Sequence, residues 1–188
     1  MPIVRTRDPT PITGDKDTTT TTADKKYYGK YRGTVSNNAD PDKLGRILAE
    51  VPDVSTEALA WAMPCVPVAG NQMCMYAVPP VGASVWIEFE QGNLDYPIWS
   101  GCFWGDASQI PPEAKPSPSS ILLNTEGGNK LIISDDPGPG GGIILKNSFT
   151  GAAITVNNEG ITIDNGKGAS ITMTGPTVNA NKGAFTVL

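Results

Sequence analysis

Residues 79–105 read PPVGASVWIEFEQGNLDYPIWSGCFWG. Apolar and polar residues alternate through SVWIEFE, which is typical of a strand with one buried face. Val85, Ile87 and Phe89 form the apolar side of this strand, and a GNLD turn then leads into a second predicted strand over 98–103. We therefore expect an antiparallel strand pair at the centre of an all-β domain.

The residues before this pair continue the same pattern. Alternation at 31–35 predicts another strand, SNNADPD at 36–42 predicts a turn, and RILAEV at 46–51 alternates again. About five short strands within residues 27–110 suit a small Greek-key barrel of the OB type. We predict an OB-fold domain over this range.

Two polar segments flank the predicted domains. Residues 1–26 contain three prolines and five consecutive threonines, and predict a flexible or extended N-terminal arm. This terminus has no apolar segment after its two arginines, so we expect assembly in the cytoplasm without a signal peptide. PPEAKPSPSS at 111–120 predicts a stiff linker.

The last 68 residues show an irregular β-repeat with no helical pattern. Glycine, asparagine and aspartate turns separate short alternating strands, and the apolar residues recur at spacings near 7 and 10, as at Ile154, Ile161, Ile171 and Val178. The predicted strands are 131–134, 143–146, 154–156, 161–163, 171–173 and 185–188.

The predicted tail, 121–188, poses a burial problem because each strand has a short apolar face. A single-chain solenoid would have about three coils and two uncapped ends, which is a marginal design. Three chains around one axis let each apolar rib face two copies of itself and pair the strand edges. We therefore favour a homotrimer with a triple-stranded intertwined β-helix, and the single-chain solenoid remains the alternative. The expected axial residues are Ile143, Ile154, Val156, Ile161, Ile163, Ile171, Met173 and Val178.

Composition excludes the commonest catalytic designs. The 188 residues include no histidine, so neither a Ser-His-Asp triad nor a histidine metal site can form within the chain. Glu88 and Glu90 lie two residues apart on a predicted strand, which is how a half-buried strand displays its solvent face. GPGGG at 138–142 precedes a strand and not a helix, so a helix N-terminus for phosphate is missing. We predict no enzyme activity, no catalytic residue, no cofactor and no metal.

The three cysteines predict neither disulfides nor a metal site. Cys65, Cys74 and Cys102 are odd in number and lack CxxC spacing. Free cysteines are among the residue types most often buried, so we expect small buried apolar thiols.

Charge argues against a nucleic-acid partner. The formal net charge is −5, and residues 27–110 contain four basic and nine acidic residues. Trp86, Trp99 and Trp104 could stack on single-stranded bases, but this domain lacks the basic groove that such binding requires. An OB-fold nucleic-acid-binding protein nevertheless remains an alternative, as does a β-helical tail protein that binds glycans through outward threonines and asparagines.

A family resemblance joins these segments. DPDKLGRILAEVP at 40–52, WAMP at 61–64 and the stretch 79–105 resemble the OB-domain signature of phage baseplate spike and VgrG-like proteins. A linker followed by a β-helical tail resembles the second half of the same family. The residues that match the signature, and that we expect in the OB core, are Leu44, Gly45, Arg46, Trp61, Gly82, Val85, Phe89, Gly92, Pro97 and Gly101, together with Pro80 in the turn.

The resemblance implies a structural spike protein of a contractile injection system or phage tail-like particle. Such a spike docks on a hub protein at the end of the inner tube and pierces the target envelope; inner tube subunits are a further partner that the family context allows. Because 26 residues cannot form a hub, we expect the hub to be a separate protein. The chain ends in the apolar strand AFTVL, which a trimer would expose, and our hypothesis is that a separate PAAR-type tip protein caps this end by binding Phe185, Val187 and Leu188.

Overall fold

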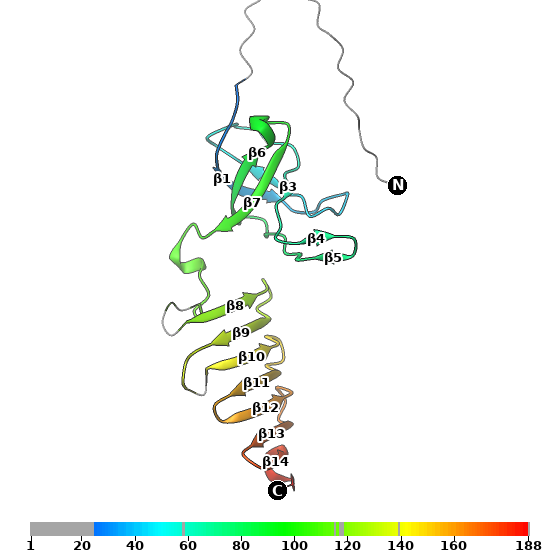
Figure 1. The fold of residues 1–188 in the computed structure, drawn as a ribbon, viewed down its shortest axis with the longest axis vertical. Helices are drawn as coiled ribbons and strands as arrows, with labels where there is room; N and C mark the ends of the chain where they lie inside the picture. The colour runs from blue at the N-terminus through cyan, green and yellow to red at the C-terminus, as the bar shows by residue number, and fades with distance from the viewer. Residues whose placement is uncertain (1–24, 58, 115, 117–118, 139, 188) are drawn as a thin grey trace, which may run out of the picture.

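The computed structural model describes residues 25–187, apart from 58, 115, 117–118 and 139. Most of the predicted N-terminal arm, residues 1–24, therefore lies outside the described residues. Regular structure in the described part of the chain consists of strands and three short 3-10 turns, which confirms the all-β prediction. Figure 1 shows a barrel-like domain at one end of an elongated molecule and a stack of strands at the other.

The first domain is built on a five-stranded sheet in the order β2-β1-β6-β7-β3. Neighbouring strands are antiparallel except β3, which runs parallel to β7. The strands are β1 (Tyr31–Asn37), β2 (Leu48–Glu50), β3 (Met63–Pro64), β6 (Ser84–Phe89) and β7 (Pro97–Phe103).

The core of this domain lies where the sequence pattern predicts it. Val85, Ile87 and Phe89 on β6 are all buried, and the residues between them are half-buried. Trp99 on β7 is also buried, and its Nε1 donates a hydrogen bond to the carbonyl oxygen of Gly45 at 3.1 Å. This bond ties β7 to the turn that precedes β2.

A close backbone contact holds the connection between β6 and β7 in place. The connection begins with the 3-10 turn η1 (Glu90–Gly92), in which Gly92 is buried with φ +74. A Cβ at Gly92 would lie 3.1 Å from the backbone nitrogen of Tyr27, and this nitrogen donates to the Gly92 carbonyl at 3.0 Å. Glycine is therefore required here by both the backbone conformation and the close approach of the chain.

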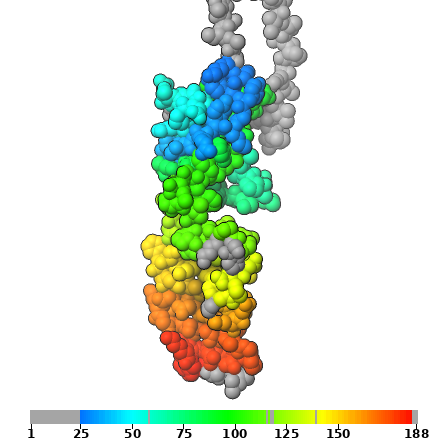
Figure 2. All heavy atoms as spheres, turned by 90° about the vertical axis from the view of Figure 1, so that its left-hand side faces the viewer, coloured from blue at the N-terminus to red at the C-terminus, as the bar shows by residue number. Residues whose placement is uncertain are grey.

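A two-stranded hairpin stands apart from the barrel sheet. It consists of β4 (Ala69–Gly70) and β5 (Met73–Cys74), and these strands pair only with each other among the described residues. Figures 1 and 2 both show the hairpin projecting from the side of the barrel. Every residue from 69 to 77 is exposed in the single chain.

The expectation of buried thiols is wrong for the single chain. Cys65, Cys74 and Cys102 are all exposed and free. Cys74 is part of the projecting hairpin, and Cys65 lies in the segment that leads to it. The prediction failed because it rested on the general tendency of free cysteines to be buried, which does not account for a hairpin that projects from the barrel.

The second domain is one eight-stranded antiparallel sheet in which each strand pairs with the next along the chain. The six predicted tail strands are present, and β8 and β14 are two further strands. A second 3-10 turn, η2 (Ala107–Gln109), lies between the domains, and a third, η3 (Asn181–Gly183), precedes the last strand. The strands are β8 (Ser120–Asn124), β9 (Lys130–Ser134), β10 (Gly142–Lys146), β11 (Ala153–Asn157), β12 (Gly160–Asp164), β13 (Ser170–Thr174), β14 (Thr177–Ala180) and β15 (Phe185–Val187).

Among the described residues, no helix has the length and apolar character needed to span a membrane.

Candidate trimer interface

One face of the tail sheet is apolar along almost its whole length. Because the strands pair in register, residues of the same kind lie directly opposite one another, as Ile154 does with Ile163 and Val156 with Ile161. These pairs build two parallel columns on one face of the sheet. The first column is Ile121, Ile133, Ile143, Val156, Ile161, Met173 and Val178, and the second is Leu123, Leu131, Leu145, Ile154, Ile163, Ile171 and Ala180.

This face lacks a cover in the single chain. The exposed fraction is 63% for Ile121, on the first strand of the sheet, and still 41% for Ile163, on β12. The opposite face carries polar residues from β11 onward, with Thr155, Thr162 and Thr172 aligned across three strands. A contiguous exposed apolar surface of this size marks an interaction site.

All eight residues predicted to pack around the trimer axis lie on this apolar face. Their packing against other protomers stays a prediction, because the structure contains one chain. Sequence reasoning missed six further members of the face; ILLN at 121–124 and LIIS at 131–134 each begin with three consecutive apolar residues, so alternation does not single out one face there. The missed residues are Ile121, Leu123, Leu131, Ile133, Leu145 and Ala180.

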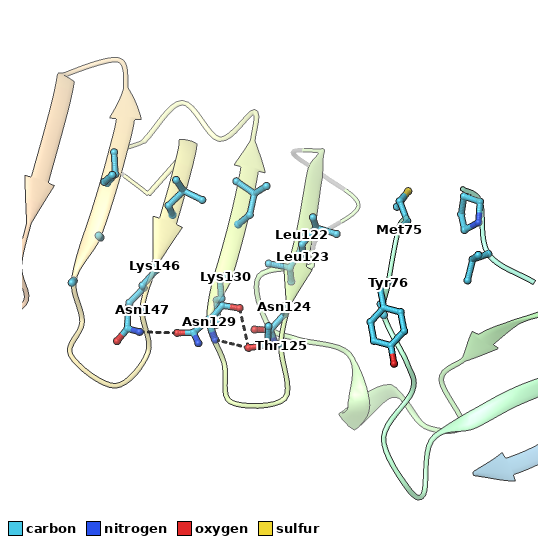
Figure 3. A pocket seen from close by; sticks show the side chains of 18 of the residues that line it. Met75, Tyr76, Leu122, Leu123, Asn124, Thr125, Asn129, Lys130, Lys146 and Asn147 are labelled. Atoms are coloured by element: carbon cyan, nitrogen blue, oxygen red, sulfur yellow. Dashed lines mark hydrogen bonds between the residues drawn. The ribbon is translucent and has the colours of Figure 1, made fainter. Parts of the chain in front are cut away.

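Asparagines hold the turns at one edge of the tail sheet. The side-chain amide of Asn147 donates to Oδ1 of Asn129 at 3.1 Å (Figure 3). The backbone nitrogen of Ser148 donates to the same oxygen at 3.1 Å. Oδ1 of Asn147 accepts from the backbone nitrogen of Thr150 at 2.9 Å. One turn further along, Oδ1 of Asn165 accepts from two backbone nitrogens of its own turn. Each side chain thus satisfies backbone groups that the strands leave unpaired.

A large groove separates the barrel from the apolar face of the tail. Its volume is about 1290 Å³. The barrel side consists of 65–67, 75–77 and 99–101, and the tail side includes Leu123 and Leu131. Figure 3 shows Met75 and Tyr76 on one side of this space and Leu122 and Leu123 on the other. The groove is therefore continuous with the apolar face.

The linker is attached to the first tail strands. Lys130 on β9 forms an ion pair with Glu113, and the hydroxyl of Ser120 donates to the Glu113 carbonyl oxygen at 3.2 Å. The hydrogen bond from Lys130 lowers the pKa of Glu113 from its ordinary value. These contacts connect the linker to β8 and β9.

The end of the sheet carries the residues predicted to bind a tip protein. Phe185 on β15 is 67% exposed. Val187 forms part of the same strand, but its side chain and the whole of Leu188 lie outside the described residues.

In the barrel, a charged turn carries part of the signature. The guanidinium of Arg46 contacts the carboxylates of Asp40 and Asp42 at 2.6 and 2.5 Å. Asp40 also accepts backbone hydrogen bonds from Asp42, Leu44 and Arg46 itself. The bond from Arg46 holds the pKa of Asp40 well below its ordinary value. Arg46 also lies over the ring of Trp61, with 5.7 Å to the ring centre.

The other signature residues divide by burial. Gly45, Val85, Phe89, Gly92 and Pro97 are buried, and Arg46, Trp61 and Gly101 are half-buried.

Two signature residues are not part of the core in the single chain. Leu44 is 54% exposed, because its turn is held by the Asp40 carboxylate and its side chain lies outside the sheet. Gly82 is exposed with φ +86, and its backbone nitrogen donates to Val35 at 2.8 Å. Its role lies in the geometry of the turn before β6.

The two glutamates near the end of β6 do not form a paired acid site. Lys30 donates to Glu88 at 2.9 Å and to Ser100 at 2.8 Å. The Lys30 bond lowers the pKa of Glu88, whereas a general acid requires a raised one. Glu90 begins η1 and has left the strand. In the described part of the chain no cluster of His, Cys, Asp or Glu is arranged to hold a metal ion.

An OB-type barrel followed by a sheet with one uncovered apolar face defines a protein that assembles through its C-terminal domain. Comparison with protein families identifies both halves. Residues 31–104 match the type VI secretion system/phage-baseplate injector OB domain, and residues 120–186 match the phage baseplate V C-terminal trimerisation domain. The chain belongs to the phage baseplate V family of spike proteins, which are similar to VgrG. No curated protein matches the chain.

The family assignment gives the quaternary structure. The protein is a homotrimeric baseplate protein with an OB-fold domain and a β-helical trimerisation domain. The uncovered apolar face of the tail is the surface that a trimer would bury.

Proposed function

We propose that the protein is the spike at the tip of a contractile injection system or phage tail-like particle. Its OB domains dock on a separate hub protein at the end of the inner tube, and its β-helix points toward the target envelope. The observation that supports this proposal is the order of the two family domains along the chain, with the OB domain first and the trimerisation domain at the C-terminal end.

The tail suits a mechanical role. Every neighbouring pair of strands from β8 to β15 is hydrogen-bonded, so the sheet has no gap along its length. Burial of the apolar columns between three chains would add a dry core to this framework. The sheath supplies the work of penetration, and the spike needs stiffness and slow unfolding in place of an active site.

The barrel end that faces away from the tail is the surface that we assign to the hub. Tyr28 and Tyr96 are 70% and 59% exposed, and both lie near η1. In Figure 1 the β6–β7 connection is at the opposite end of the barrel from β8. Exposed tyrosines are typical of protein interfaces because they bury a large ring and keep a polar hydroxyl.

At the other end of the molecule, we propose that a PAAR-type protein caps the trimer through Phe185, Val187 and Leu188. Three exposed copies of Phe185 would form an apolar surface, which a tip protein would cover. Binding of a purified PAAR protein encoded beside this one, and its loss in Phe185→Ser, would support the cap. A spike that binds no such protein would contradict it.

Electron microscopy of assembled particles tests the spike function. Particles containing a tagged chain should bind gold-labelled antibody at the baseplate end of the tube and nowhere else. We expect penetration of target cells to be lost in Ile161→Asp/Ile163→Asp and kept in Thr162→Asp, whose side chain lies on the opposite face. Label along the tube, or particles that penetrate normally without the protein, would overturn the proposal.

A further inference from the structure

The β4–β5 hairpin and the segment that follows it expose large apolar side chains that the fold of one chain leaves uncovered. Met75 and Tyr76 are 58% and 68% exposed, and Met73 on β5 is 64% exposed. An isolated two-stranded hairpin is marginally stable in water, and three neighbouring large apolar side chains would add to the penalty of exposure. These three residues are here called the hairpin patch.

Two of the three residues of the hairpin patch border the apolar face of the tail. Met75 and Tyr76 line the same groove as Leu123 and Leu131, which belong to the apolar columns. We expect a neighbouring protomer to cover those columns on trimerisation. Where it covers their first residues, on β8 and β9, that protomer also enters this groove. The barrel side of the groove then contacts another protomer and not solvent.

We propose that the hairpin patch of each protomer packs against the first tail strands, β8 and β9, of a neighbouring copy of this chain. The occupant of the groove is therefore a second copy, inserted between the barrel and the tail of the first. Each barrel is then connected to its own tail by the linker and to the tail of a neighbouring chain by this contact. The contact fixes the ring of barrels relative to the β-helix, so that force at one end reaches the other without bending at residues 111–119.

The chemistry of the patch suits such a contact. Methionine side chains adapt to irregular apolar surfaces, and a tyrosine ring contributes a large area with little rotamer freedom to lose. The surfaces that face them on β8 and β9, Ile121, Leu123 and Ile133, are 63%, 62% and 40% exposed in the single chain. Both partners are thus apolar and uncovered before assembly.

Chemical crosslinking between differently tagged chains tests this contact. Cys65, Cys74 and Cys102 are exposed, and each can first be replaced by serine. One chain then carries Tyr76→Cys and the other Leu123→Cys, so that each has a single cysteine. After co-expression and treatment with a short bismaleimide, we expect a covalent dimer that contains both tags.

A matched control uses another exposed tyrosine of the barrel. Tyr96 is 59% exposed and does not line the groove. Tyr96→Cys paired with Leu123→Cys should give at least tenfold less of the mixed dimer. A trimeric mass with no mixed dimer, or with equal yields from Tyr76 and Tyr96, would overturn the hairpin contact and leave the spike function intact. A monomeric mass would overturn the contact together with the trimer.

Discussion

Asn129 and Asn147 lie 18 positions apart in the sequence and are joined by a side-chain hydrogen bond of 3.1 Å. The bond spans two consecutive turns at one edge of the tail sheet. Asn165 follows after a further 18 positions and holds the next turn of that edge. The repeating unit of the tail is therefore a pair of strands, with an asparagine at the same place in each unit.

Replacement of Asn147 tests the contribution of this edge. Asn147→Ala removes the donor to Asn129 and the acceptor for Thr150, both on exposed turns. We expect a loss of about 1 kcal/mol per chain in the stability of the tail. The measurement is the rate of trimer unfolding in guanidinium, followed by far-ultraviolet circular dichroism.

Asn158→Ala provides the control for this substitution. Asn158 makes one long side-chain contact, to Pro137 at 3.4 Å, and is exposed. Its replacement should change the unfolding rate much less. Equal rates for the two variants would mean that the asparagine edge does not stabilise the tail.

The apolar columns can be broken without changing the barrel. Ile161→Asp/Ile163→Asp places two carboxylates in each chain on the face that we predict the trimer to bury. Unpaired buried charges are strongly unfavourable, so we expect no trimer. The mass in solution should fall from three times 19.7 kDa to that of one chain.

Tryptophan fluorescence shows whether the barrel survives this change. All four tryptophans, Trp61, Trp86, Trp99 and Trp104, lie in the barrel domain, so their emission reports on that domain alone. The emission of the double variant should match that of the trimer, while Thr162→Asp should keep the trimer. An ordered trimer from the double variant would rule out the axial packing.

The sequence predicts the individual strands of the tail better than it predicts the strand pair as their repeating unit. The spacings of 7 from Ile154 to Ile161 and of 10 from Ile161 to Ile171 together cover 17 residues, close to the 18 that separate the asparagines of successive strand pairs. Counting apolar residues alone obscured the unit, because the asparagines that recur at its turns are polar. No strand is predicted at β8, because its first residue, Ser120, falls in the predicted linker and serines and prolines precede it directly.

In the barrel, sequence alternation predicts the buried core but not the exposed apolar residues. Alternation was sufficient to place Val85, Ile87 and Phe89 in the core, because one buried face requires that period. It could not locate the cysteines or the hairpin patch, whose residues are apolar but exposed in the single chain. Their environment depends on how far the hairpin projects and on what covers it, and neither property has a local sequence signal.

The ion pair in the Asp40–Arg46 turn predicts sensitivity to acid. The folded-state pKa of Asp40 is lowered from 3.8, so the unfolded chain binds a proton more readily. The stabilisation is therefore complete above about pH 5 and is lost as the pH falls below about 4. Asp40→Asn should lower the melting temperature at neutral pH and reduce its further decrease on going to acid.

Tryptophan fluorescence during heating measures this effect in the full-length protein. Asp95→Asn, at an exposed position of the β6–β7 connection, serves as the control and should keep the wild-type response to pH. Parallel melting curves for wild type and Asp40→Asn at all pH values would show that the ion pair does not stabilise the barrel.

The bond between Trp99 and Gly45 predicts the largest single effect in the barrel. Trp99→Phe removes the Nε1 donor, leaves the Gly45 carbonyl oxygen without this partner and opens space beside a buried strand. We expect a loss of about 2–4 kcal/mol, since an unsatisfied buried acceptor and a cavity add together. Urea unfolding followed by the remaining tryptophans gives this value.

Trp104→Phe serves as the control. It removes an indole that is 62% exposed and should cost less than about 0.5 kcal/mol. Similar losses for both variants would mean that tryptophan removal in general, and not the bond to Gly45, determines the stability.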